Sequence, residues 1–245
     1  MMVRGRHLAV LATVAAVAGS IGFAVPVSAA RPAPSGPKTL PFDGYTWTVK
    51  AATRKIGPGP NLFSPDLAWV DAGGALHLRI AKVSGRWNVS EVINQASLGY
   101  GTYSWTVRAD LDALDPQAVL GLFTWNDDPA YNHRELDVEF SRWANRADTT
   151  NGQFVVQPYD HTGNLLRITQ PRGPATTTHG FTWWPDRVDF FSSASPSSWS
   201  YSGPDVPRPG GENARMNLWL FRGTAPSNGQ PAEIVITDFT FTPLS

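Results

Sequence analysis

From about residue 40 onward, the chain consists of short apolar or alternating runs that are separated by Gly, Pro, Asn and Asp. Residues 75–80, 103–108 and 233–237 are examples, and each has the composition of a β-strand. No long stretch combines the 3.6-residue period with the capping residues of an α-helix. The 21 prolines and 22 glycines suit a chain with many turns. The sequence therefore predicts an all-β fold, a sandwich or a barrel of short strands.

Residues 134–140, RELDVEF, alternate between acidic and apolar side chains. In a strand, Glu135, Asp137 and Glu139 share one face, and three apolar side chains share the other. Three carboxylates in a row repel one another and stabilise nothing by themselves, so the pattern indicates a site. Glycoside hydrolysis uses two carboxylates, one as nucleophile or base and one as proton donor. A solvated acidic strand and a cation site are the alternatives.

The first 29 residues have the features of an export signal. Two arginines precede an uncharged apolar run over residues 8–27, and small residues follow it. This order predicts a secretory signal peptide, residues 1–29, with cleavage after Ala29 or Ala30, and hence a secreted, extracellular protein. We expect residues 30–40 to be a flexible leader and residues 41–245 to form a single domain. An uncleaved membrane anchor is the alternative, because the apolar run approaches spanning length.

The composition of the chain excludes some classes of partner and some sources of stability. Without Arg4 and Arg6, 18 of the 20 basic residues remain against 20 acidic ones, a net charge of −2, which argues against nucleic acid as a partner. The chain has no cysteine, so disulfides and thiolate metal sites are excluded. A hydrophobic core must therefore hold the fold together. We expect most of the ten tryptophans to pack in that core and some to stack on sugar rings.

Several motifs occur together and in order around the acidic run. They are GYGTY at 99–103, GLFTW at 121–125, HGFTWWP at 179–185, MNLW at 216–219 and TDFTF at 237–241. With RELDVEF, this set resembles glycoside hydrolase family 16, the licheninase- and laminarinase-type β-glucanases with an E-x-D-x-E signature. The aromatic spacing in 179–185 is shorter than the family's. The resemblance implies a concanavalin A-like β-jelly-roll sandwich, two antiparallel sheets with a concave substrate cleft.

The resemblance also implies roles for the acidic run: Glu135 is the nucleophile, Glu139 the general acid/base, and Asp137 the residue that tunes them. Glu139 must hold a proton that it can donate, and its negative neighbours raise its pKa. We therefore expect a bell-shaped activity profile on the acid side of neutral pH. The implied reaction is retaining hydrolysis of internal β-glycosidic bonds, with a β-1,3/1,4-glucan as the expected substrate and no cofactor required for catalysis.

Other functions fit the same sequence. A transglycosylase uses the same chemistry with a sugar as acceptor, and a non-catalytic polysaccharide-binding or cell-envelope protein could use the same cleft. A binding protein has no need of three costly acidic side chains, which disfavours that reading. A metal-dependent nuclease is disfavoured because the chain has only five histidines and no evident basic cleft. We expect a polysaccharide as partner, no membrane contact after signal cleavage, and a monomer.

The resemblance further implies substrate-binding residues and a metal site. The residues that match sugar-contacting positions are Glu91, Trp125, Gln153, Asn217 and Trp219. A structural calcium is common in the family, and its aspartate ligand would be Asp238, because calcium prefers oxygen ligands.

Three positions depart from the licheninase pattern. Ile93 stands where these enzymes have an arginine, and Val155 where they have an asparagine, so two sugar contacts are expected to be missing. His133 stands where they often have a tryptophan, and we expect it to be a solvated loop residue. These departures leave open which linkage is cleaved.

Overall fold

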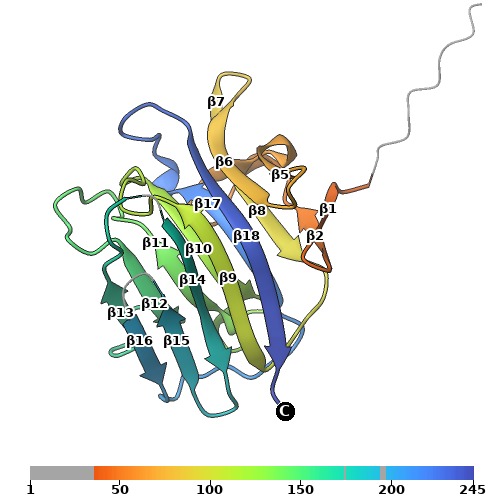
Figure 1. Ribbon diagram of the computed structural model, residues 1–245, viewed down its shortest axis with the longest axis vertical. Helices are drawn as coiled ribbons and strands as arrows, with labels where there is room; N and C mark the ends of the chain where they lie inside the picture. The colour runs from red at the N-terminus through yellow and green to blue at the C-terminus, as the bar shows by residue number, and fades with distance from the viewer. Residues whose placement is uncertain (1–35, 174, 194–196) are drawn as a thin grey trace, which may run out of the picture. The chain divides into compact units, whose positions relative to one another are not determined.

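The computed structural model describes residues 36–173, 175–193 and 197–245, which all belong to one unit, Gly36–Ser245 (Figure 1). The predicted signal peptide, residues 1–29, and the first part of the predicted leader lie outside the described residues. Strand β1 begins at Thr39, within the leader interval of 30–40. In the described part of the chain, no helix is long and apolar enough to cross a membrane.

The described residues form eighteen β-strands and three short 3-10 helices. The strands are β1 (Thr39–Phe42), β2 (Tyr45–Val49), β3 (Ala52–Ile56), β4 (Asn61–Phe63), β5 (Ala68–Val70), β6 (Leu76–Val83), β7 (Arg86–Asn88), β8 (Ser90–Asn94), β9 (Gly101–Ala109), β10 (Ala118–Trp125), β11 (Leu136–Phe140), β12 (Gly152–Val156), β13 (Leu165–Ile168), β14 (Ala175–Trp183), β15 (Val188–Ser192), β16 (Ser197–Tyr201), β17 (Asn213–Leu220) and β18 (Ala232–Pro243). The 3-10 helices are η1 (Pro65–Leu67), η2 (Asn132–Arg134) and η3 (Phe221–Gly223).

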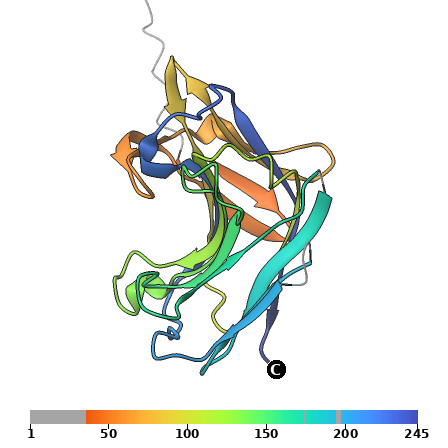
Figure 2. The ribbon, with the colours of Figure 1, turned by 90° about the vertical axis from the view of Figure 1, so that its left-hand side faces the viewer.

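Two large antiparallel sheets stack as layers, which Figure 2 shows from the side. The first sheet has the order β1-β2-β8-β17-β10-β11-β12-β13. The second has the order β16-β15-β14-β9-β18-β6-β5, with β7 paired to β6, and β3 and β4 form a separate hairpin. Several neighbours in these orders, such as β8 with β17 and β9 with β18, are distant in the sequence, as in a jelly roll. The predicted all-β jelly-roll sandwich is confirmed.

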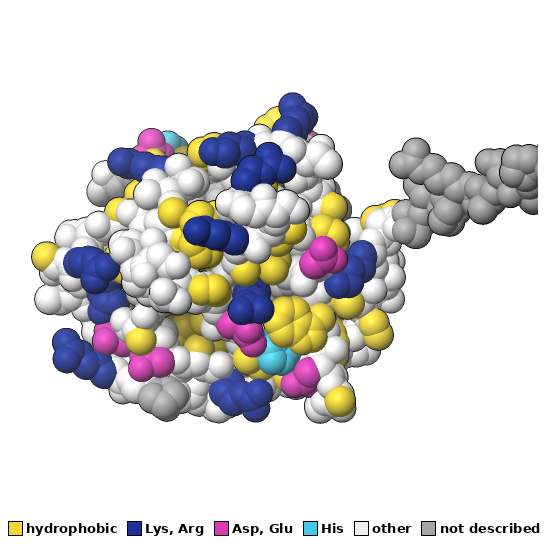
Figure 3. Space-filling model, turned by 90° about the horizontal axis from the view of Figure 1, so that it is seen from above, with side chains coloured by type: hydrophobic (Ala, Val, Ile, Leu, Met, Phe, Trp, Pro, Cys, Tyr) yellow, Lys and Arg dark blue, Asp and Glu magenta, His cyan; other side chains and the backbone are white. Residues whose placement is uncertain are grey.

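Charged side chains of both signs are mixed on the surface. On the face shown in Figure 3, Lys and Arg side chains are interspersed with Asp, Glu and neutral groups. This face therefore lacks the single-sign field that attracts a polyanion.

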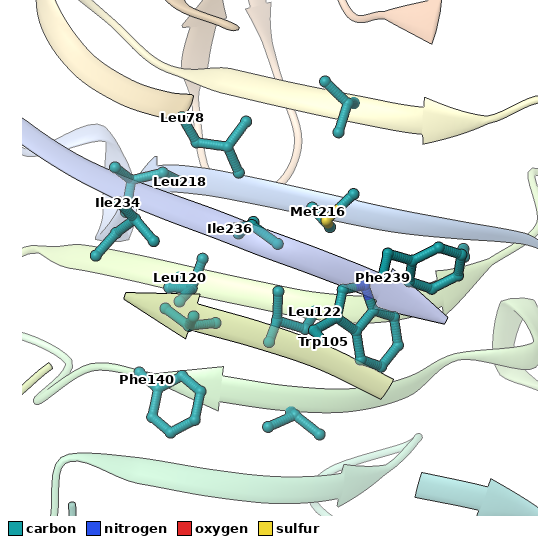
Figure 4. Close-up of a cluster of buried hydrophobic side chains, with 14 of the residues drawn as sticks. Leu78, Trp105, Leu120, Leu122, Phe140, Met216, Leu218, Ile234, Ile236 and Phe239 are labelled. Carbon is teal, nitrogen blue, oxygen red and sulfur yellow. The ribbon is translucent and has the colours of Figure 1, made fainter. Parts of the chain in front are cut away.

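The core lies between the two sheets. Leu120 and Leu122 of β10, Trp105 of β9, and Ile236 and Phe239 of β18 belong to one buried cluster (Figure 4). The pairing of β18 with β9 shifts by one residue after Ile236, and this bulge turns both Ile236 and Phe239 toward the core.

Five of the tryptophans lie either in the core or on the opposite face of the first sheet. Trp47, Trp105 and Trp183 are completely buried, as expected of core residues. Trp125 and Trp219 lie on strands of the first sheet and point away from the core, into a cleft. The side-chain alternation of each strand thus separates a packed face from a face that is free for a ligand.

Candidate active site

The outer face of the first sheet lines a cleft with a volume of about 1020 Å³. This is at the upper end of the roughly 300–1,000 Å³ that ligand sites usually occupy. Strand pairing aligns one row of residues across six strands of its floor. In order from β8 to β13, the row consists of Glu91, Asn217, Gly121, Glu139, Gln153 and Arg167.

The three acidic residues of the run 134–140 all line this cleft. Asp137 and Glu139 lie on β11, and Glu135 immediately precedes that strand. The apolar side chains of Leu136 and Val138 are fully buried on the other face. The predicted division between an acidic face and an apolar face is therefore present, and the acidic face belongs to the cleft.

A tight loop delivers Glu135 to the start of β11. Four consecutive residues before it, 131–134, have φ between 51° and 62°, a left-handed conformation that is costly for side chains other than glycine. Thr124 of β10 ties the loop down, because its hydroxyl donates to the Arg134 carbonyl at 2.8 Å and accepts from the Leu136 N–H at 3.2 Å. Strain of this kind persists where the surroundings enforce it, as they do beside this cleft.

Burial raises the pKa of all three carboxyls. Burial, followed by the charge of Glu139, raises the pKa of Glu135 to about 8. Burial and the charges of both neighbours raise the pKa of Asp137 well above its usual value. Burial also raises the pKa of Glu139, opposed by hydrogen bonding from Gln153 and by the charge of Arg167. Because the pKa of each carboxyl is raised, the activity profile is expected to extend to higher pH than the acid-side profile inferred from sequence.

The carboxyl of Asp137 forms hydrogen bonds with Glu135 and with Gln157. The hydrogen bond with Glu135 lowers the pKa of Glu135 and raises that of Asp137. A protonated Asp137 would donate this bond, and an ionised Glu135 would accept it. The amide nitrogen of Gln157 donates to Oδ2 of Asp137 at 3.0 Å. Asp137 can therefore carry a proton and stabilise a negative charge on Glu135.

Glu139 is held from the β12 and β13 side. The amide nitrogen of Gln153 donates to Oε2 of Glu139 at 2.7 Å. Arg167 of β13 donates in turn to Oε1 of Gln153 at 3.1 Å. Gln153 was predicted to contact substrate, and the structure places its side chain on the predicted acid/base residue.

The opposite side of the cleft contains a buried ionic group. Glu91 is 1% exposed, and its carboxylate lies 2.9 Å from the ammonium of Lys50 and 3.5 Å from the guanidinium of Arg215. Arg215 also lies 3.5 Å from Asp127. Asn217 donates to Glu91 at 3.4 Å, and its own Oδ1 is buried without a hydrogen-bond partner in the protein. Such an oxygen is suited to accept from a ligand hydroxyl.

Arg215 bears on one of the departures from the licheninase pattern. It is paired directly with Ile93 across β17 and β8, and its side chain faces the cleft. A guanidinium therefore lies beside the position where the family arginine is missing. No comparable polar replacement faces the cleft at Val155, which is fully buried.

The expectation for His133 is wrong. His133 is half-buried and stacks on Trp125 with ring centroids 4.0 Å apart and planes 7° apart. Its Nδ1 lies 2.8 Å from the carbonyl oxygen of Asn126. Because His133 lies in the short turn η2 between two strands, no strand or helix period in the sequence indicates this contact. The histidine backs one face of Trp125, whose indole is fixed further by a 2.9 Å hydrogen bond to Asp127.

The structure brings all five predicted binding residues, Glu91, Trp125, Gln153, Asn217 and Trp219, to the same cleft as the acidic run. The sequence interpretation missed Arg215, Arg167 and Gln157, which also line it. Arg215 precedes Asn217 by two positions and so shares its face of the strand, a signal that was available. Arg167 lies in a short apolar strand and carried no such signal.

Asp238 lies outside the cleft, at the bulge of β18. Nearby Asp43 accepts the Phe239 N–H at 2.6 Å, and burial raises the pKa of Asp43, with a further contribution from the charge of Asp238. Calcium usually takes six to eight oxygen ligands. Among residues 36–245 as described, no three acidic or histidine side chains gather into a metal site, so carbonyl oxygens would have to complete one. Calcium at Asp238 stays a prediction.

The raised pKa of Glu135 predicts a stability that falls with pH. Between the usual value of 4.5 and about 8, the folded protein binds more protons than the unfolded chain, so stability is lost as pH rises. The loss is roughly 2–5 kcal/mol. Glu135→Gln should remove it, so that the stability gained over wild type is larger at pH 8 than at pH 5 in urea unfolding.

Two comparisons isolate this effect. Buried His179 has a pKa lowered to about 3 and therefore opposes the trend below its usual value of 6.5, but it is common to both proteins and cancels in their difference. Asp186→Asn, at a carboxylate that is 78% exposed, is the control and should leave the pH dependence unchanged. Parallel wild-type and Glu135→Gln curves between pH 5 and 8 would contradict the prediction.

Gly121 predicts a second measurable effect. A Cβ atom at this position would lie 2.5 Å from Oδ1 of Asn217, so Gly121→Ala must displace that amide. If Asn217 binds substrate, we expect KM to rise about tenfold. In the Asn217→Ala background, the same alanine should have little further effect, because the clashing oxygen is gone. Equal effects of Gly121→Ala in both backgrounds would show that the glycine serves another purpose.

Comparison with known proteins places the fold. No protein-family model matches the sequence, and no curated protein sequence matches it either. Among solved structures, the β-glucanase of Bacillus licheniformis is 18% identical with a TM-score of 0.64, over 86% of this chain and 100% of that one. A family 16 protein of the mixed-linkage glucan system of Bacteroides ovatus, in complex with its G4G4G3G product, is 12% identical with a TM-score of 0.63, over 80% and 94%.

A third similar structure differs in its description. It is an immunostimulatory antigen and pseudo β-1,3-glucanase of Mycobacterium tuberculosis, 20% identical with a TM-score of 0.56, over 78% of this chain and 88% of that one. At these identities, the likeness establishes the fold. The resemblance inferred from sequence is confirmed at that level: the chain has the jelly-roll fold of the family 16 β-glucanases.

Proposed function

We propose that this protein is a secreted glycoside hydrolase of family 16 that cleaves internal bonds of a β-1,3/1,4-glucan with retention of configuration. The observation that carries the proposal is the placement of Glu135, Asp137 and Glu139 together in one large cleft, where burial raises the pKa of all three carboxyls. Structural neighbours that are β-glucanases support the substrate class.

In the first step, the Glu135 carboxylate attacks the anomeric carbon while the bond to the leaving sugar oxygen breaks. Glu139 transfers its proton to that oxygen, so the leaving sugar departs as a neutral alcohol. Asp137, acting as a hydrogen-bond donor, keeps Glu135 charged before the attack. The product of this step is a glycosyl ester of Glu135 and an ionised Glu139.

In the second step, Glu139 removes a proton from a water molecule, and the resulting hydroxyl attacks the same anomeric carbon. The ester bond breaks, and Glu135 recovers its charge. Two inversions restore the original configuration. The charge of Arg167 favours the ionised form of Glu139, the form in which it acts as a base.

Aromatic and polar groups of the cleft suit a sugar chain. Trp125, backed by His133, presents an aromatic ring to the cleft, and Trp219 lies at another part of its wall. Flat apolar rings and scattered hydrogen-bonding groups match the two faces and the hydroxyl edges of pyranose rings. The polysaccharide is the proposed partner, bound by a monomeric protein outside the cell, without a nucleic acid or membrane partner.

A non-catalytic polysaccharide-binding protein is the second candidate, because one similar structure is described as a pseudo β-1,3-glucanase. The complete acidic trio favours catalysis. A single assay separates the two: reducing ends released from mixed-linkage β-glucan, laminarin, xyloglucan and agarose by the purified protein, with Glu135→Gln as control. Release from one polymer that is abolished in the control supports the hydrolase. Binding to a polymer without release from any supports the second candidate.

A further inference from the structure

Gln153 lies between Glu139 and Arg167, and its contacts determine which way its amide points. Its Nε2 donates to Oε2 of Glu139 at 2.7 Å, and its Oε1 accepts from Nη1 of Arg167 at 3.1 Å. A guanidinium only donates hydrogen bonds, so the side of the amide that faces Arg167 must be the oxygen. The NH₂ group must then face Glu139.

Arg167 is itself held in place. Its Nη2 donates to Oδ2 of Asp148 at 3.0 Å, its Nε donates to Oγ1 of Thr150 at 2.9 Å, and the guanidinium lies 4.3 Å from the centre of the Trp143 ring. A planar group with this many fixed donors has little freedom to rotate. The side chain that orients Gln153 is therefore rigid.

We propose that Arg167 is a positioning residue for proton transfer: by locking the amide of Gln153, it confines the transferable proton of Glu139 to Oε1. Oε2 accepts the amide N–H, so an acidic proton on the same oxygen would point at another donor. If the Gln153 amide turned over, its oxygen would face Oε2 of Glu139 and could accept a hydrogen bond from a proton on that oxygen. The proton would then point at Gln153 on β12 and away from the substrate. The catalytic role of Arg167 rests on the proposed function, whereas the orientation of the Gln153 amide can be tested in the protein without substrate.

Several charged groups surround Glu139. Asp137 lies on the same strand, and Glu135 immediately precedes that strand. Arg167 faces Glu139 from β13, and Glu91 lies beyond Gly121 and Asn217 in the same row. The other charged groups that line the cleft are Lys50, Asp127, Asp148 and Arg215. The Gln153 N–H and the Arg167 charge both favour ionised Glu139, so loss of either should raise the pKa of Glu139.

The first test requires no substrate. In the wild-type protein, we expect the side-chain ¹⁵N signal of Gln153 to shift as Glu139 titrates, and Glu139→Gln should abolish this shift. Arg167→Met frees the amide and should reduce the shift by more than half. Arg172→Met, which removes an arginine that is 93% exposed shortly after the same strand, should leave it intact. An undiminished shift in Arg167→Met would overturn the proposal.

Kinetics and a second variant complete the test. We expect Arg167→Met to lower kcat roughly 10- to 100-fold, with a smaller change in KM, and to move the alkaline limb of the pH profile upward. If Arg167→Met does not fold, Gln153→Met provides the test: it must raise the pKa of Glu139 in carboxyl ¹³C titrations. An unchanged pKa would refute the hydrogen bond from Gln153 to Oε2 of Glu139 on which the proposal depends. A wild-type protein that is inactive but shows the Arg167-dependent ¹⁵N shift would refute the proposed function and leave the positioning intact.

Discussion

Glu135→Ala is expected to lower kcat for β-glucan hydrolysis by about 10⁴-fold or more, because the protein can then form no ester bond to the anomeric carbon. The neighbouring carboxyls cannot replace it. Asp137 is hydrogen-bonded to Gln157, and Glu139 is held by Gln153 on the next strand. Water could attack in the empty space, but the carboxyl beside it, Asp137, has a pKa raised well above its usual value and is therefore a poor base. The assay is the release of reducing ends from the polymer that the wild-type protein cleaves.

Azide makes this prediction specific. A small anion can enter the space left by Glu135 and attack the anomeric carbon from the nucleophile's face, while Glu139 still protonates the leaving oxygen. The product is a glycosyl azide of α configuration, because only one inversion occurs. NMR of the product identifies the anomer, and Asp186→Ala, at an exposed carboxylate, controls for nonspecific effects. Activity within tenfold of wild type would exclude Glu135 as the nucleophile.

The acidic site could be predicted from sequence because its key information is local. Glu135, Asp137 and Glu139 lie within five consecutive positions, and strand alternation alone places them on one face. The motif at 216–219 likewise places Asn217 and Trp219 on one face, and both line the cleft. The alternation of side chains shows which residues of one strand share a face, and it does so without knowledge of the neighbouring strands.

The rest of the site depends on pairing between distant strands. Arg215 lies opposite Ile93, and Arg167 lies opposite Gln153, as a consequence of sheet order and register. A shift of one residue in either pairing would turn these side chains to the other face. The sequence could show that Ile93 departs from the family pattern, but only the register shows that a guanidinium stands beside it. Likewise, the stacking of His133 on Trp125 depends on the path of a loop.

Glu139→Ala is expected to lower kcat on the natural polysaccharide roughly 10²- to 10⁴-fold. For an aryl glycoside whose leaving group departs without a proton, the rate of the first step, attack by Glu135, should fall much less. The alkaline limb of the pH profile should also disappear, since that limb reports the ionisation of Glu139. Reducing-end assays and a dinitrophenyl glycoside measure the two rates. An equal loss on both substrates would exclude Glu139 as the acid.

The azide products of the two variants show which glutamate is the nucleophile and which is the acid/base. The pKa shifts of the free protein do not favour the proposed assignment. Burial raises the pKa of Glu135 to about 8, whereas Gln153 and Arg167 favour the ionised form of Glu139. The proposed roles therefore require that Asp137 keep its proton and stabilise Glu135 as a carboxylate when a sugar fills the cleft. If they hold, Glu139→Ala gives the β-glycosyl azide, because azide replaces water in the second step after one inversion at Glu135. An α-azide from Glu139→Ala and a β-azide from Glu135→Ala would reverse the two roles.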